Sequence, residues 1–191
     1  MAFLSEYRRV VELKGSRVAD AQRHSEARWT PPEAGFVKLN TDGAISTVRH
    51  SFGMGAILRD CAGEVVAAMA CPGQGAVDAT VAEACSLLKA LKWAQDLSLT
   101  KIIMESDCAC IVTTLNTESF TANSSLSSIL LDCKMIMASF HACRVQHVHR
   151  TGNSVAHELA KGALQAEADE YWMGAIPEDI AHVVARDKQV V

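Results

Sequence analysis

The chain has 191 residues, of which 49% are hydrophobic and 21% charged, with four prolines and a formal net charge of −4. This composition is typical of a single globular domain with a sizeable core, and it excludes disordered and fibrous proteins. The net charge excludes a global basic field, so a polyanionic partner would have to bind at a local basic cluster or through metal ions.

The sequence carries no membrane or secretory signal. It has no run of about 18 uncharged apolar residues, and Glu6, Arg8 and Arg9 interrupt the N-terminal segment too early for a signal peptide. We therefore expect a soluble, intracellular protein with no membrane partner, in the nucleus or the cytoplasm. The seven cysteines are odd in number and scattered, which favours reduced, mostly buried thiols over disulfides and offers no paired ligands for zinc.

The N-terminal segment differs in composition from the rest of the chain. Residues 1–28 are charged and contain few large apolar side chains, which predicts a loosely attached leader, helical or flexible. Pro31 and Pro32 end this segment, because proline cannot donate a backbone hydrogen bond and restricts the residue before it. The domain proper is expected to begin at Trp29.

Strand and helix signals then alternate along the chain. The predicted strands cover residues 36–41, 53–59, 64–70, 101–107 and 143–148. The predicted helices cover residues 77–96, 108–116 and 127–140, and a last helix begins at Asn153, whose side chain can cap its first turn. In the long helix, the expected apolar positions are Val77, Val81, Cys85, Leu88 and Leu91.

The order of these elements predicts the fold class. A turn signal at Asp60–Gly63 joins two of the first three strands, which indicates an antiparallel meander. Helices after the third, fourth and fifth strands indicate an α/β fold, with a mixed sheet and helices packed on its faces. No Gly-rich phosphate loop or internal repeat is present.

Three acidic residues stand where apolar packing would be the default. Asp42 closes the first predicted strand, Asp107 closes the fourth, and Glu83 lies in the first half of the long helix. If the two strands are neighbours, the three carboxylates converge, and this arrangement favours a hard divalent cation such as Mg²⁺. Taken singly, each has a structural explanation: a turn at Asp42-Gly43, an exposed helix position for Glu83, and a helix cap for Asp107.

Five motifs carry a resemblance to a known family. The stretches "WTPPEAGFVKLNTDGA", "GMGAILRDCAGEVV", "AEACSLLKAL", "ESDC" and "HVHRTGNSVAHELAK" occur in this order between Trp29 and Ala163. Together they resemble ribonuclease H type 1, and most closely the plant retroelement-derived ribonuclease H-like domains. Residues 29–168 then correspond to the domain, and residues 169–191 to a C-terminal extension that packs onto it.

The resemblance implies a structure and an activity. The implied fold is a five-stranded mixed sheet, three antiparallel strands followed by two parallel ones, with helices on both faces. The implied activity is endonucleolytic cleavage of the RNA strand of an RNA/DNA hybrid by a monomer with two Mg²⁺ ions, for which Mn²⁺ can substitute. Asp42, Glu83 and Asp107 match the first three catalytic, metal-binding acids of the family.

The fourth acid of the family is replaced here by His157. A nitrogen ligand in place of a carboxylate should weaken Mg²⁺ binding and relatively favour Mn²⁺. Near the edge of the predicted apolar face of the last helix, His157 is as compatible with surface exposure as with metal binding. The alternative function is therefore a catalytically weak or inactive domesticated domain that still binds nucleic acid.

Further site residues are implied by the same comparison. The family commonly has a histidine before the last helix, and here His149 is preferred over His147 as a catalytic residue. The implied substrate-binding residues are Gly43 and Ala44, whose backbone can approach a ribose 2′-hydroxyl, together with Thr80 and Arg150.

Overall fold

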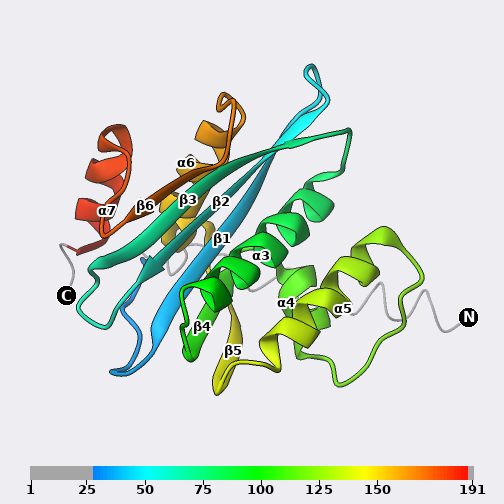
Figure 1. The fold of residues 1–191 in the computed structure, drawn as a ribbon, viewed down its shortest axis with the longest axis horizontal. Coiled ribbons are helices and arrows are strands. Elements are labelled where there is room, and N and C mark those ends of the chain that lie inside the picture. Colours follow the sequence, from blue (N-terminus) through cyan, green and yellow to red (C-terminus); the bar gives the residue numbers. More distant parts are fainter. Residues whose placement is uncertain (1–27, 189–191) are drawn as a thin grey trace, which may run out of the picture.

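The structure is a computed structural model that describes residues 28–188, so the predicted leader lies outside the described residues except for Arg28. Six strands form one sheet in the order β5-β4-β1-β2-β3-β6 (Figure 1). They are β1 (Val37–Ser46), β2 (Ser51–Arg59), β3 (Val65–Gln74), β4 (Lys101–Ser106), β5 (Ala142–His147) and β6 (Glu170–Met173).

The pairing of the strands confirms the predicted mixed sheet. β1, β2 and β3 form the antiparallel meander, while β4 pairs in parallel with both β1 and β5. The expectation of five strands is wrong by one, because β6 pairs with β3 in antiparallel orientation. This strand has only four residues, three of them exposed, so it shows too short an alternation of apolar and polar residues to be recognised.

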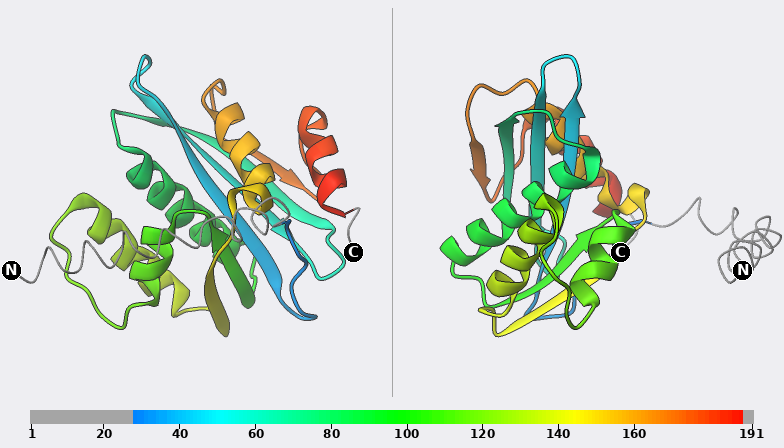
Figure 2. Two further views of the ribbon diagram at one scale, coloured as in Figure 1. Left: turned by 180° about the vertical axis from the view of Figure 1, so that it is seen from behind. Right: turned by 90° about the vertical axis from the view of Figure 1, so that its right-hand side faces the viewer.

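Helices cover both faces of the sheet, as predicted (Figure 2). They are α3 (Ala79–Asp96), α4 (Ala109–Asn116), α5 (Ser125–Met137), α6 (Ser154–Ala163) and α7 (Ala181–Lys188), with short 3-10 turns η3 (Arg150–Asn153) and η4 (Glu178–Ile180). The Asp78 side chain caps α3 by accepting from the backbone N–H of Val81 at 2.9 Å. Within residues 28–188, no helix combines the length and the apolar character needed to cross a bilayer.

Two hydrophobic cores lie on opposite sides of the sheet. In β2, Met54, Ala56 and Leu58 enter the core shared with α3, α4 and α5, whereas Ile57 enters the core shared with α6 and α7. This division follows from the alternation of side chains along a strand. The C-terminal residues Ile180 and Val183 complete the second core, so the segment after α6 packs onto the sheet.

The buried face of α3 differs from the predicted one. Of the five predicted apolar positions, only Leu91 is fully buried. The buried residues of the helix are Ala82, Ala84, Ser86, Leu87, Ala90, Leu91 and Ala94. Small side chains allow the helix axis to approach the sheet, and the bulkier Cys85 and Leu88 are left half-buried at the side of the helix.

The cysteines agree only in part with expectation. All seven lie in the described range as free thiols, which agrees with the prediction of reduced cysteines. Only Cys71 and Cys133 are fully buried, while Cys61 and Cys110 are exposed, so the expectation that most are buried is wrong. Cys61 lies in the hairpin turn and Cys110 on the outer side of α4, where the apolar character of the local sequence does not decide burial.

Helix α6 rests on the backbone of β2 through glycines. A Cβ atom added at Gly55 would lie 2.3 Å from the backbone nitrogen of Ala160, and one added at Gly53 would lie 2.0 Å from the carbonyl oxygen of Ala160. The predicted apolar face of α6 is confirmed by its buried residues Val155, Ala156, Leu159, Ala160 and Ala163. The position of this helix therefore depends on the absence of side chains at Gly53 and Gly55.

Replacing Gly55 by alanine should separate α6 from the sheet. We expect Gly55→Ala to lower the free energy of unfolding by about 1–3 kcal/mol, because the backbone of the helix must move to accept the methyl group. The control is Gly162→Ala in α6, where an added Cβ meets nothing within 4 Å. This variant should gain up to ~1 kcal/mol from helix propensity. Urea denaturation of both variants measures the difference, and equal stabilities would contradict the close packing of α6 on β2.

Candidate metal centre

The candidate site lies where β1 and β4 separate. Their parallel pairing ends at Asn40 and Glu105, after which β4 stops at Ser106 while β1 continues to Ser46 alongside β2. Asp42 therefore lies within β1, opposite Gly55 of β2, and the expectation that it closes the strand is wrong. The Asp-Gly turn signal is overridden because β2 supplies a continuous antiparallel partner.

Glu83 reaches the same place from α3. A Cβ atom on Gly43 would lie 2.4 Å from the backbone nitrogen of Glu83, so this glycine lets the first turns of α3 touch β1. Gly43 is thus required for packing, and its predicted role in substrate binding stays a prediction. The contact sets the distance between the strand that carries Asp42 and the helix that carries Glu83.

Three carboxylates converge at the fork between the strands, as the sequence predicted. One oxygen from each of Asp42, Glu83 and Asp107 lies within 4.8 Å of the others. Glu83 Oε2 is buried without a hydrogen-bond partner. Burial, followed by the hydrogen bond and charge of Asp42 and the charge of Asp107, raises the pKa of Glu83 to about 10.

These groups fit a divalent cation. An oxygen that is buried and unpartnered, next to two further carboxylates, has the donor chemistry that Mg²⁺ and Mn²⁺ require. In the absence of a cation, the raised pKa of Glu83 keeps its proton in place and limits the repulsion among the three acids. A cation would take over the role of that proton.

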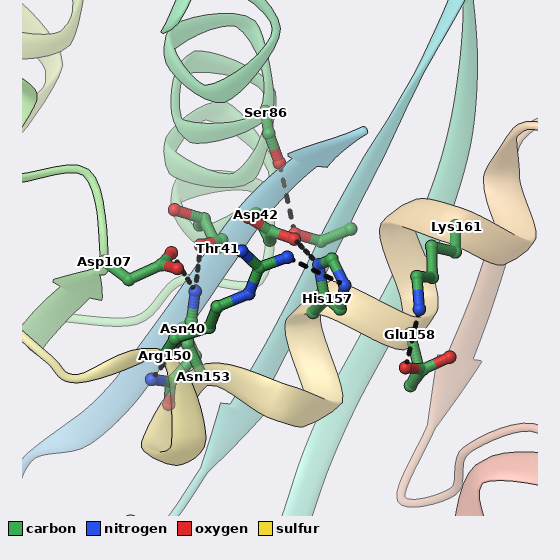
Figure 3. Close-up of polar contacts among 11 residues, drawn as sticks. Asn40, Thr41, Asp42, Ser86, Asp107, Arg150, Asn153, His157, Glu158 and Lys161 are labelled. Carbon is green, nitrogen blue, oxygen red and sulfur yellow. Dashed lines mark hydrogen bonds and ion pairs between the residues drawn. The ribbon is translucent and has the colours of Figure 1, made fainter. Parts of the chain in front are cut away.

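Asn153 holds two parts of the site together, although the sequence suggested only a helix cap. Its side chain makes no capping hydrogen bond to α6. Instead, Nδ2 donates to the carbonyl oxygen of Thr41 and to Asp107 Oδ1, both at 2.9 Å (Figure 3). The expectation of a cap is wrong because η3 precedes α6 and turns this side chain toward the sheet. The sequence contains no local signal for this role.

His157 contacts Asp42 directly. Its Nδ1 lies 2.6 Å from Asp42 Oδ2, and its Nε2 lies 3.4 Å from Nη2 of Arg150 (Figure 3). Because a guanidinium can only donate, both contacts are satisfied when Nε2 accepts and Nδ1 donates. The side chain is 25% exposed, between the two alternatives that the sequence left open. Its binding of a metal stays a prediction, since the cluster of three carboxylates does not include it.

The remaining predicted residues lie on β1, on α3 and in the segment from the end of β5 to the start of η3. His149 contacts Thr151 Oγ1 through Nδ1 at 3.0 Å at the start of η3, whereas His147 lies 3.2 Å from the carbonyl oxygen of Asp107. Thr80 is half-buried in the first turn of α3, and Ala44 is half-buried in β1 beyond Asp42. Their catalytic and substrate-binding roles stay predictions.

A buried polar network behind the carboxylates was not foreseen from the sequence. Lys38 Nζ pairs with Glu105 at 2.6 Å, and Arg59 pairs with Asp187 of α7 at 2.8 Å, all four side chains being at most 8% exposed. Asn40 lies between the two pairs and is fully buried. The only available signal was the presence of polar residues inside apolar strands, which does not identify their partners.

Comparison with known proteins gives a consistent result. A family model described as reverse transcriptase-like matches residues 40–163, a range that contains all three carboxylates and His157. A putative ribonuclease H protein from Arabidopsis thaliana is 26% identical over 159 residues, which are 83% of this chain. The chain spans 25% of the length of that relative.

Solved structures show the same fold. The ribonuclease H1 of the archaeon Halobacterium salinarum superposes with a TM-score of 0.63 at 25% identity, covering 68% of this chain and 98% of that one. LC11-RNase H1, solved in complex with an RNA/DNA hybrid, superposes with a TM-score of 0.60 at 20% identity, covering 68% and 96% of the two chains.

The raised pKa of Glu83 predicts how stability depends on pH in the presence of a chelator. Between its ordinary pKa of 4.5 and its folded value of about 10, the folded chain holds a proton that the unfolded chain releases. The proton on Glu83 therefore contributes its full stabilisation below pH 4.5. As the pH rises toward about 10, the free energy of unfolding falls by at most about 1.4 kcal/mol per pH unit.

Glu83→Gln should remove this dependence. We expect the variant to be more stable than the wild type at about pH 8, and to approach it at about pH 5, because an amide cannot ionise. Glu158→Gln is the control, since this partly exposed carboxylate on α6 pairs with Lys161 outside the cluster. Urea denaturation in the presence of a chelator measures the slopes, and an unchanged slope in Glu83→Gln would contradict the assignment.

Proposed function

This chain belongs to the reverse transcriptase-like, ribonuclease H-like family, and we propose that it is a divalent-metal-dependent endonuclease that cleaves the RNA strand of RNA/DNA hybrids. The observation that carries the proposal is the convergence of Asp42, Glu83 and Asp107 around an unpartnered buried carboxylate oxygen. The RNA/DNA hybrid bound by LC11-RNase H1, which shares the fold, supports the choice of substrate.

The carboxylates would hold two Mg²⁺ ions, for which Mn²⁺ can substitute. When bound, such ions supply Lewis-acid chemistry to phosphodiester hydrolysis by activating a water nucleophile and stabilising the leaving oxygen. Asp42 lies between Glu83 and His157 and is the residue suited to contact both ions. Glu83 would give up its proton to solvent in order to hold a cation, and Asp107 is held in place by Asn153.

We assign substrate contacts to residues on the elements that carry the metal centre. Arg150 has its guanidinium beside His157, and we assign to it a contact with a backbone phosphate. Gly43, Ala44 and Thr80 flank the carboxylates on β1 and α3, and we assign contacts with the RNA 2′-hydroxyl to this side of the site. His149, before α6, is the candidate for proton transfer or product release.

A second candidate function is favoured by His157 itself. In this structure its Nδ1 is directed at Asp42 Oδ2, at the place where the family carries a fourth carboxylate. A domain with only three acids would bind Mg²⁺ weakly and could act as a nucleic-acid-binding module with little or no catalysis. Both functions predict that the protein binds nucleic acid, but only the first predicts that it cleaves the RNA strand.

Cleavage of a labelled RNA/DNA hybrid in Mg²⁺ and in Mn²⁺ tests the first function. We expect RNA cleavage by the wild type and a loss of about a thousandfold in Asp42→Asn, which keeps the shape of the side chain but removes its charge. Glu158→Gln serves as the matched control with full activity, because it removes a carboxylate of α6 that lies outside the cluster. Hybrid binding without cleavage in either metal would support the second function instead.

The identity of residue 157 should set the preferred metal. We expect the wild type to be more active in Mn²⁺ than in Mg²⁺, and His157→Asp to shift the ratio toward Mg²⁺ by about tenfold or more, because a carboxylate is the harder ligand. The ratio of cleavage rates in the two metals measures the effect independently of protein concentration. An unchanged ratio would exclude His157 from the metal centre.

A further inference from the structure

Asn153 occupies the point where the sheet loses its regular hydrogen bonds. The register of β1 with β4 ends at Asn40 and Glu105, so the Thr41 carbonyl lies past the last paired residues. Asn153 Nδ2 donates to this oxygen at 2.9 Å and thereby supplies the hydrogen bond that β4 no longer provides at this position. Thr41 directly precedes Asp42, so the contact fixes the backbone from which that carboxylate extends.

The same amide group reaches the second acid of the centre. Asn153 Nδ2 also donates to Asp107 Oδ1 at 2.9 Å, on the side chain just past the end of β4. One side chain, itself 1% exposed, is therefore bonded to the segments that carry Asp42 and Asp107 (Figure 3). This bond engages one acceptor site of the Asp107 carboxylate and leaves its other acceptor sites available to a cation.

The orientation of the Asn153 amide is determined by its neighbours. Its Oδ1 accepts from Asn40 Nδ2 at 3.3 Å. A flipped amide would place an oxygen against the Thr41 carbonyl and the Asp107 carboxylate, and a nitrogen against the Asn40 amide nitrogen, so all three contacts would be repulsive. Only a side chain with two donors and one acceptor in this arrangement satisfies the three partners.

Asn40 is itself immobilised from behind the site. Its Oδ1 accepts from Trp29 Nε1 at 2.9 Å and from Arg59 Nη2 at 3.3 Å, and its Nδ2 donates to Glu105 at 3.0 Å. Arg59 stacks on the Trp29 ring, with its guanidinium carbon 3.6 Å from the ring centroid, and its charge is balanced by Asp187. Both polar atoms of the Asn40 side chain are therefore hydrogen-bonded in a buried setting, which limits its motion, so it can hold Asn153 in one position.

From this geometry we infer that Asn153 is a positioning residue for the metal centre. It sets the separation and orientation of the Asp42 and Asp107 carboxylates before any cation binds, and it acts through Asp107 and the Thr41 backbone without touching cation or substrate. The inference rests on the proposed function, because it assigns a cation to the three carboxylates. Its role is distinct from that of His157, which contacts Asp42 alone among them.

The test measures cation affinity separately from activity. Calorimetric titration with Mn²⁺ alone should show affinity reduced by about tenfold or more in both Asn153→Ala and Asn153→Leu, because partners of metal ligands contribute at this level. The leucine variant nearly preserves the volume, so it separates the loss of hydrogen bonds from the loss of packing. Affinities within about twofold of the wild type in both variants would overturn the inference.

Two controls separate positioning from general destabilisation. Leu130→Ala truncates a buried side chain of α5, 1% exposed and outside this network, and should lower stability while leaving Mn²⁺ affinity unchanged. In an Asp107→Asn background, Asn153→Leu should produce a smaller further loss of affinity than it does in the wild type, because the part of its effect that passes through Asp107 is already lost. Additive losses, or an equal loss in Leu130→Ala, would show that Asn153 acts only on the stability of the fold.

A wild-type measurement covers the case in which the variants fail to fold. In protein labelled with ¹⁵N-asparagine, the side-chain amide of Asn153 should exchange slowly with solvent and shift during a Mg²⁺ titration. A rapidly exchanging amide with no shift would overturn the inference.

The failure of the proposed function can be told apart from the failure of this inference. If the wild type binds the cation but does not cleave hybrids, the proposed function fails, while the comparison of Mn²⁺ affinities still tests the role of Asn153. If the wild type binds no cation, both the proposed function and the inference fail.

Discussion

Strands β1 and β4 separate after Asn40 and Glu105, and the polar groups at this fork must be satisfied without a regular strand partner. The fork is where the Thr41 carbonyl loses its neighbouring strand and where Asp42, Glu83 and Asp107 approach within 4.8 Å. An acid cluster of this kind repels itself, and burial adds to the cost of each charge. The surrounding structure is arranged to meet this constraint by a retained proton on Glu83 and by hydrogen bonds from Asn153 and His157.

The network behind the fork shows how both ends of the described chain contribute to it. Trp29 lies near the start of the described range and Asp187 near its end, and both contact Arg59. Replacing a buried ion pair by apolar residues often costs nothing, so the pair of Arg59 and Asp187 is weak evidence for stability by itself. Its position next to Asn40 gives it a structural reason, since it keeps the acceptor of Asn40 occupied and the orientation of that amide fixed.

Close approach of the helices is the second requirement of the site. Gly43 lets α3 touch β1, and Gly53 and Gly55 let α6 touch β2. The alanine-rich buried face of α3 serves the same purpose. Because Glu83 and His157 have side chains of limited reach, a helix displaced by even one methyl group would withdraw its functional group from Asp42.

The amino-acid sequence alone indicated a mixed sheet with helices packed on its faces and, provided that the first and fourth strands are neighbours, the convergence of the three acids. These features follow from local periodicity and from the rule that neighbouring parallel strands end at the same edge, both of which can be read without coordinates. The apolar face of α6 was correct for the same reason, since its residues recur at helical spacing.

Only the tertiary structure decided the role of Asn153, the half-buried contact of His157 with Asp42, the alanine face of α3 and the addition of β6. Each depends on partners far apart in the chain: 112 residues separate Thr41 from Asn153, and 128 separate Arg59 from Asp187. A side-chain amide has the same local signature whether it caps a helix or bridges two strands. Its partner is chosen by packing, and packing is a property of the folded chain as a whole.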